Sequence, residues 1–269
     1  MQRREFLAAS TAAAFSVAAA ASVTTAADEP SGKQLIELRT YHFATPAKRQ
    51  AFEAFLAQAG VPAFGRAGAG PVGVFKLLAK DNAALKLTED SNDLYVLLPH
   101  QSPESFLQFE RRLAADEAYQ SAGRDVLGSP KSEPAYTRYE SSLMLGFDEC
   151  PRVAAGPRSE SRLVQLRIYE SHNEERAKKK IHMFNEGGEI AIFRRVGMHP
   201  VFFGESLAGA KLPNLTYMVA FDDDAAMTKA WDAFRGDPEW KKLSGDQTYK
   251  DTVSNITNLV LRPAPGSQV

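Results

Sequence analysis

GGEIAIFRRVGMHPVFFGESLAGAKLPNLTYMVAF, residues Gly187–Phe221, is the stretch of sequence that decides the fold. Its pattern predicts the end of an amphipathic helix, a turn at Gly197–Pro200, a strand, a loop containing glycine and proline, and a second strand. A fainter copy occupies Pro62–Pro99. The chain is therefore interpreted as two copies of one unit.

The repeat extends over most of the chain. The segment Leu35–Tyr41 recurs 128 residues later as Leu163–Tyr169, and both copies contain Leu-Arg-x-Tyr. Further along, Tyr217 is matched with Tyr95, 122 residues earlier. An offset that drifts slowly while the order of the matches is kept indicates an internal duplication with shortened loops.

Each copy is predicted to have the element order β-α-β-β-α-β. The pairs Thr45-Pro46 and Ser102-Pro103 are typical of helix starts. In the first copy, alternating apolar residues predict strands at 34–41, 72–78, 94–98 and 138–145. This order is that of a ferredoxin-like unit, a four-stranded antiparallel sheet with both helices on one face.

The fold class that follows is α+β. Helices on one face leave the other sheet face exposed, and a large exposed apolar face is normally covered. We therefore expect two tandem ferredoxin-like domains packed sheet to sheet, as a dimeric α+β barrel within one chain. The expected boundaries are a first domain at 33–146, a linker at 147–160, a second domain at 161–262 and a tail at 263–269 that needs no fixed structure.

Residues 1–27 differ from the rest of the chain and resemble an export signal. Arg3 and Arg4 are followed by Phe6-Leu7, an alanine-rich run and the small residues 25–27. The arginine pair favours the twin-arginine route and a periplasmic or otherwise exported protein. An ordinary secretory leader and an uncut anchor are the alternatives. We expect no stable membrane span once the leader is removed.

Composition and motif content bound the function. The formal net charge is −1 and no basic run is interleaved with aromatic residues, so no nucleic-acid partner is expected. Cys150 is the only cysteine, which excludes an internal disulfide. No H-x-x-x-H or H-E-x-x-H spacing predicts a metal site, and no motif predicts a cofactor.

The strand alternation predicts which side chains face the barrel interior. We expect the helices to cover Ile36 and Leu38. The residues expected to face the interior or its mouth are Glu37, Arg39 and Tyr41 with their copies Gln165, Arg167 and Tyr169. The two arginines could hold an anionic group by bidentate hydrogen bonding. Alternatively, Glu37 neutralises Arg39 and both arginines belong to polar cross-strand ladders.

Further candidates lie in the second copy. His182, Glu186 and Glu189 are spaced so that one helix face could carry all three. Such a His–Glu pair could act as a general base with its orienting carboxylate, or form an ordinary surface pair. His199 could reach the barrel mouth or bond local backbone. The candidate ligand-binding residues are therefore Arg39, Tyr41, Arg167, Tyr169, His182, Glu189, His199 and Tyr217, and no catalytic residue is assigned.

Several of these segments resemble the NIPSNAP family. The segments that carry the resemblance are Leu163–Tyr169, Phe193–Gly197, Pro200–Glu205, Leu212–Tyr217 and Asp237–Trp240. It extends over about 160–262 and is weaker over about 33–146, where Asp116–Tyr119 replaces Asp-Pro-Glu-Trp. The resemblance implies a dimeric α+β barrel and no agreed reaction. Family members elsewhere are described as vesicle- or mitochondria-associated interaction proteins.

Three functions are compatible with these observations. The leading hypothesis is a module that binds a small molecule or a protein partner. The alternative is a cofactor-independent, monooxygenase-like enzyme with His182, Glu189 and Tyr217 around a cavity between the sheets. The third is a structural envelope protein that uses its helical faces for contacts. The sequence identifies neither the ligand nor the oligomeric state.

Overall fold

The computed structural model describes residues 32–269, and the export signal predicted at residues 1–27 lies outside them. The strands are β1 (Leu35–His42), β2 (Gly73–Leu77), β3 (Asp93–His100), β4 (Arg138–Gly146), β5 (Leu163–Glu170), β6 (His199–Ala208), β7 (Asn214–Phe221) and β8 (Asn255–Pro263). The α-helices are α1 (Pro46–Phe55), α2 (Val61–Ala67), α3 (Pro103–Ala115), α4 (Glu117–Ala122), α5 (Arg124–Leu127), α6 (Glu174–Phe184), α7 (Glu189–Arg195), α8 (Asp224–Gly236) and α9 (Pro238–Ser244). Short helical turns lie at η1 (Leu56–Gly60), η2 (Ala79–Asp81), η3 (Ala83–Leu85) and η4 (Gln247–Tyr249).

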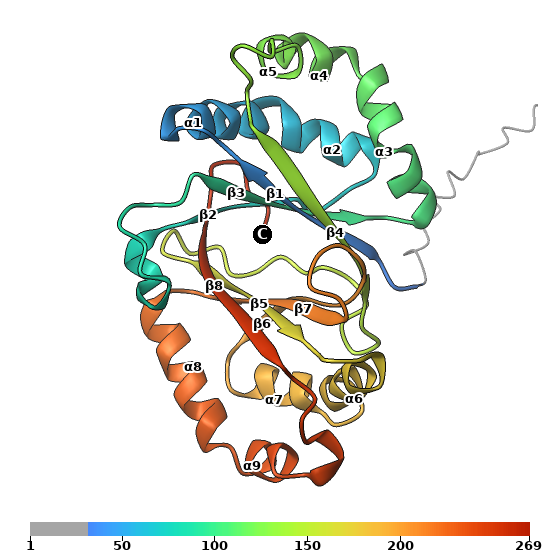
Figure 1. Cartoon of the computed structure of the whole chain (residues 1–269), viewed down its shortest axis with the longest axis vertical. Coiled ribbons are helices and arrows are strands. Elements are labelled where there is room, and N and C mark those ends of the chain that lie inside the picture. Colours follow the sequence, from blue (N-terminus) through green and yellow to red (C-terminus); the bar gives the residue numbers. More distant parts are fainter. Residues whose placement is uncertain (1–31) are drawn as a thin grey trace, which may run out of the picture. The chain divides into compact units, whose positions relative to one another are not determined.

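The strands close into one barrel in the order β1-β3-β2-β8-β5-β7-β6-β4. Within each half the order is that of a ferredoxin-like sheet. The edge strands then pair across the halves, β2 with β8 and β4 with β6, so neither sheet keeps a free edge. Helices α1–α5 lie outside the first sheet and α6–α9 outside the second (Figure 1). The predicted intrachain dimeric α+β barrel is confirmed.

The helix starts follow from the sequence. Thr45 and Ser102 cap α1 and α3 with their side chains, and a proline follows each of them. In the second half Asn173 and Asp223 cap α6 and α8 in the same way. No helix within residues 32–269 is long and apolar enough to cross a membrane.

The prediction of which strand face points inward was wrong. Ile36, Leu38 and Leu166 belong to the apolar cluster that fills the barrel interior, whereas Tyr41 and Tyr169 pack beneath the helices. The reason is that both faces of these strands carry large apolar residues, and a period of two separates the faces without saying which is covered by helices. Arg39 and Arg167 therefore lie on the helix side of the barrel wall.

The repeat match of Tyr217 with Tyr95 was also wrong, by one residue. In the strand register Arg39 pairs with Val96, and Arg167 pairs with Tyr217. Tyr217 is thus the counterpart of Val96. A slip of one residue moves a side chain to the other face, so Tyr95 points into the barrel whereas Tyr217 lies beneath the helices.

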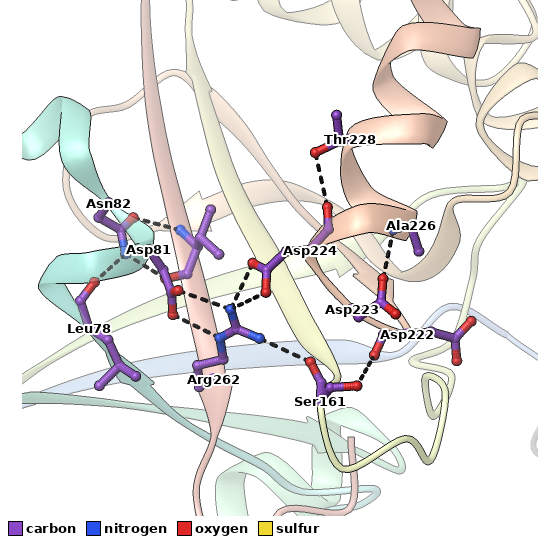
Figure 2. A network of polar contacts seen from close by, with 11 residues as sticks. Leu78, Asp81, Asn82, Ser161, Asp222, Asp223, Asp224, Ala226, Thr228 and Arg262 are labelled. Carbon is purple, nitrogen blue, oxygen red and sulfur yellow. Dashed lines mark hydrogen bonds and ion pairs between the residues drawn. The ribbon is translucent and has the colours of Figure 1, made fainter.

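A polar network joins the two halves at the seam between β2 and β8 (Figure 2). Arg262 of β8 donates to both oxygens of Asp81, at 2.8 and 2.9 Å, and to Asp224 at the start of α8. Nearby, the Asn82 amide exchanges two hydrogen bonds with the Val260 backbone. The pairing partners come from both copies, so the seam is specified by side chains as well as by the sheet.

The last residues were predicted to need no fixed structure, and this was wrong. After β8 the chain turns back along β2, where the backbone N–H of Gln268 donates to the Val72 carbonyl. The Gln268 side chain in turn accepts from the Val72 N–H at 2.7 Å. Val269 is 2% exposed and belongs to the interior cluster. Residues 263–269 thus have a fixed place against β2 and the barrel interior.

Candidate functional site

Arg39 and Arg167 occupy equivalent positions in the two repeats. Arg39 of β1 pairs with Ser141 of β4, and Arg167 of β5 pairs with Asn258 of β8. Glu37 lies two residues before Arg39, and Gln165 lies two residues before Arg167. Both arginines project from the helix-facing side of their sheet. Their surroundings can therefore be compared position by position.

The first arginine is ion-paired with two carboxylates. Arg39 Nε donates to Glu37 Oε1 at 2.8 Å and an Nη donates to Glu37 Oε2 at 3.1 Å. The same Nη donates to Glu110 Oε1 of α3 at 2.8 Å. Glu37 also accepts from the Ser141 hydroxyl at 2.6 Å and lies 3.3 Å from His100 Nε2. This agrees with the alternative in which Glu37 neutralises Arg39.

Burial alone would raise the pKa of Glu37. The hydrogen bonds from His100, Arg39 and Ser141 outweigh it and lower this pKa to about 2. The carboxylate is therefore charged at neutral pH and fixed in place. The Arg39 guanidinium is therefore neutralised within the protein, by Glu37 and Glu110.

The second arginine has no such partner. None of the hydrogen bonds or ion pairs of residues 32–269 involves the Arg167 guanidinium, and its Nε is buried without an acceptor. The guanidinium carbon instead lies 4.9 Å from the Trp231 ring centroid and 5.2 Å from that of Tyr169. A guanidinium held between aromatic rings is fixed in orientation but keeps its donors free.

Two replacements explain the difference. Gln165 stands where the first half has Glu37. Trp231 is the eighth residue of the thirteen-residue helix α8, as Glu110 is of the thirteen-residue helix α3. Both carboxylates that neutralise Arg39 are thus absent around the second arginine. Trp231 Nε1 donates to Gln165 Oε1 at 2.7 Å, so the two replacing side chains are bonded to each other.

A cavity of about 390 Å³ lies beside Arg167, between the sheet and helices α6–α9. Its walls are mainly aromatic. They comprise Tyr169, Phe193, Trp231, Phe234 and Trp240, together with Lys180, Glu189, Arg235, Val253 and Ile256. The volume falls at the lower end of the range of about 300–1,000 Å³ that small-molecule sites occupy.

The equivalent space in the first half is only about 130 Å³. There Tyr136 and Tyr139 pack over Tyr41, with ring centroids at 5.2 and 5.0 Å. In the strand register Tyr139 faces Tyr41 as Ile256 faces Tyr169. Smaller side chains therefore leave the second space open where tyrosines close the first.

One buried ion pair belongs to the cavity wall. Lys180 Nζ donates to Glu189 Oε2 at 2.8 Å, and the two residues are 5% and 2% exposed. Lys180 also lies 4.6 Å from the Phe184 ring centroid. Since Lys180 and Glu189 neutralise each other, Arg167 is left as the cavity's unpaired charge among the described residues.

Comparison with known proteins identifies this half. Residues 164–268 match the family model described as NIPSNAP. They form a NIPSNAP domain. No curated protein matches the chain in sequence.

Solved structures share the fold of the whole barrel. A candidate monooxygenase of Fusobacterium nucleatum subsp. nucleatum has a TM-score of 0.58 at 8% identity, covering 87% of this chain and 94% of that one. A candidate monooxygenase of Lactobacillus acidophilus gives 0.55 at 11%, covering 87% and 98%. An uncharacterized NIPSNAP-like domain protein of Burkholderia xenovorans gives 0.35 at 20%, covering 39% and 86%. At these identities the two monooxygenase-type structures show the fold alone, and the Burkholderia match, at a TM-score of 0.35, adds nothing to it.

The NIPSNAP domain brings together part of the predicted site. Arg167, Tyr169 and Glu189 line its cavity. Tyr217 is fully buried behind them, with its hydroxyl 3.2 Å from that of Tyr169. Burial raises the pKa of both phenols, so they stay protonated at neutral pH. Arg39 and Tyr41, which were also predicted, lie in the first half and do not line this cavity.

The two histidines of the predicted site lie elsewhere. His182 is exposed and its Nδ1 lies 2.9 Å from the Tyr249 hydroxyl. His199 is exposed at the start of β6. The single helix face expected for His182 and Glu189 does not form, because α6 ends before Gly187 and Gly188, and Glu189 opens a new helix. A His–Glu pair is therefore wrong for this site.

The barrel interior does not contain the predicted site either. Apolar side chains, including Phe75, Phe202 and Met218, fill much of it. A pocket of about 340 Å³ opens at one end, lined partly by His42, whose Nδ1 lies 2.8 Å from Asp93. No residue of the predicted site lines this pocket. The enzyme hypothesis placed His182, Glu189 and Tyr217 around an inter-sheet cavity, and that arrangement is wrong.

Sequence reasoning missed two residues of the cavity wall, Lys180 and Trp231, and also Gln165, which is hydrogen-bonded to Trp231. Lys180 and Trp231 were not singled out, and Gln165 was noted only as the copy of Glu37. The repeat itself contains the missing signal. Aligning α8 with α3 would have shown that an aromatic residue replaces the carboxylate that reaches the first arginine.

Proposed function

We propose that this protein is a small-molecule binding module whose site is the cavity of the NIPSNAP domain. The observation that carries the proposal is the contrast between the two halves. The same space between sheet and helices is closed to about 130 Å³ in the first half and opens to about 390 Å³ in the second. On this proposal the first half has a structural role in the barrel, and the second half binds the small molecule.

The lining supports a ligand with a large apolar surface. Trp240 and Phe234 lie with ring centroids 4.3 Å apart, and Phe193 lies 4.8 Å from Phe234. Small-molecule sites are typically aromatic clefts with few polar groups. A cluster of tilted and edge-to-face rings offers broad contact area and loses little side-chain entropy on binding.

The proposal is tested by filling the cavity with tyrosine side chains, as Tyr136 and Tyr139 fill the equivalent space in the first half. The variant Val253→Tyr/Ile256→Tyr installs tyrosine at the position of Tyr139 and at the neighbouring wall residue. A library of small aromatic compounds is screened for changes in melting temperature. Compounds that stabilise the parent protein should not stabilise the filled variant. Lys211→Ala, at the barrel mouth, is the control and should respond like the parent. Equal shifts in the parent and the filled variant would refute the cavity as the site.

Export is a separate proposal. It is supported by the arginine pair Arg3-Arg4, the Phe6-Leu7 that follows, and the small residues before position 28. Arg3→Lys/Arg4→Lys should retain the protein in the cytoplasm if the twin-arginine route is used, because that route reads the arginine pair. Cell fractionation with mass spectrometry of the mature N-terminus measures this. Unchanged export of the variant would contradict the route.

A further inference from the structure

We infer that the cavity of the NIPSNAP domain is a receptor for an aromatic carboxylic acid, with Arg167 binding the carboxylate. This inference rests on the proposed function and names its ligand class. It starts from one fact, that the guanidinium in the cavity wall lacks an anionic partner although its counterpart in the other repeat has two.

The missing partner is an anion. Arg167 is half-buried, and its Nε is fully buried without an acceptor. Removing a charged group from water without giving it a partner carries a desolvation cost. The first half avoids it by placing Glu37 and Glu110 against Arg39. The second half has Gln165 and Trp231 at those positions, so its own carboxylates do not reach Arg167. A bound anion would restore the arrangement that the first half completes internally.

The other charges of the cavity do not compete for this role. Lys180 forms an ion pair with Glu189 at 2.8 Å. Arg235 is exposed and ion-paired with Asp232. Glu189 is the one carboxylate in the wall, and it is bonded to Lys180. An incoming anion therefore meets one free guanidinium and no uncompensated negative charge.

The geometry favours a carboxylate on a flat apolar body. A guanidinium presents parallel N–H donors that match the two oxygens of a carboxylate. Trp231 and Tyr169 hold this fork in place by covering it at 4.9 and 5.2 Å. The remaining walls, Phe193, Phe234 and Trp240, are aromatic and suit a ring. A guanidinium also matches a phosphate, so inorganic phosphate is titrated beside the carboxylate as a competing anion.

The protein provides its own optical probe. It contains two tryptophans, Trp231 and Trp240, and both line the cavity. Tryptophan fluorescence excited beyond the absorption of a phenyl ring therefore reports on this cavity. The probes are phenylacetate, its neutral isostere phenylacetamide, and inorganic phosphate, each titrated into the full chain, with calorimetry as the second readout.

Two isosteric substitutions form a matched pair. Gln165→Glu places in the second half the carboxylate that the first half has, and should neutralise Arg167 from within. Glu37→Gln makes the reverse change in the first half. We expect phenylacetate to bind the parent at least tenfold more tightly than phenylacetamide. Gln165→Glu should remove this preference while phenylacetamide binding is retained, and Glu37→Gln should leave the preference unchanged. Arg167→Gln should lower phenylacetate affinity at least tenfold.

The outcomes separate the two proposals. If phenylacetate and phenylacetamide bind equally well, the cavity is a binding site but the ligand class is wrong. If phosphate binds more tightly than phenylacetate, the inferred carboxylate is likewise overturned. If none of the probes changes the fluorescence or releases heat at millimolar concentration, both the ligand class and the proposed site are refuted. Unchanged phenylacetate affinity in Arg167→Gln would overturn the role of Arg167.

Discussion

Arg39 and Arg167 hold the same place in two copies of one sheet, yet only Arg39 is bonded to carboxylates. Each half of the barrel has a space between its sheet and its helices. In the first half, tyrosines and an internal ion-pair network close that space. In the second, Gln165 and Trp231 stand in place of the two carboxylates, and the space is open. This asymmetry is the basis of the proposed division into a supporting half and a binding half.

The two arginines should contribute very differently to stability. Arg39→Met leaves the Glu37 carboxylate buried without its cation, and should lower the free energy of unfolding by about 3–5 kcal/mol. Arg167→Met removes no ion pair and should cost no more than about 1 kcal/mol, mainly from lost contact with the rings. Urea unfolding of both variants measures the difference. Equal losses would contradict the contrast between the two sites.

Glu37 should make the fold sensitive to acid. Its pKa falls from 4.5 to about 2 on folding. The stabilisation is fully present above pH 4.5 and is lost as the pH falls towards 2, because the folded state then has to take up a proton that the unfolded chain binds more readily. One pKa unit is worth about 1.4 kcal/mol, so the group contributes on the order of 3 kcal/mol at neutral pH. Glu37→Gln should flatten the loss of stability between pH 4.5 and 2. An unchanged pH profile would show that Glu37 is not the group responsible.

Lys180 and Glu189 should be strongly coupled. Removing either partner leaves a buried charge, so Lys180→Met or Glu189→Gln alone should cost about 3–5 kcal/mol. The double variant should recover a large part of that loss, since no charge remains unpaired. A double-mutant cycle by denaturant unfolding gives the coupling. Additive losses would mean that the two side chains do not depend on each other.

Arg262 should hold the two halves together at the β2–β8 seam. It is bonded to Asp81 of the first half and to Asp224 of the second (Figure 2). Its hydrogen bonds lower the pKa of Asp81, which favours the charged carboxylate at neutral pH. Arg262→Gln should cost about 2–3 kcal/mol and increase amide exchange in β2 and β8 more than elsewhere. Uniform exchange across the barrel would contradict a local role.

Much of the fold could be predicted from the sequence. The repeat, the strand alternation and the caps at Thr45 and Ser102 are local signals, and they lead to the barrel without further information. The face of each strand could not be assigned. An arginine in a strand suggests a solvent-exposed face. Arg39 can lie beneath the helices because Glu37 and Glu110 neutralise its charge there.

The site was predicted only in part, for a related reason. Arg167 and Tyr169 were named because they repeat a visible tetrad. The feature that sets Arg167 apart lies on α8, in a different element, where Trp231 replaces a carboxylate. The single helix face drawn through His182 and Glu189 failed at two adjacent glycines. The surroundings of Arg167 depend on a residue replaced in a distant helix and on a break between two helices. The residue spacing within one segment reports neither.

The central claim is that Arg167 of the NIPSNAP domain binds an organic acid in the open cavity. A crystal structure of the protein grown with phenylacetate tests this most directly. The account predicts the carboxylate within about 3 Å of the Arg167 guanidinium nitrogens, the usual distance of a charge-assisted hydrogen bond, and the ring against Trp231 or Trp240. Density for the acid at Arg39 or at the barrel mouth, with the Arg167 cavity holding only solvent, would contradict it.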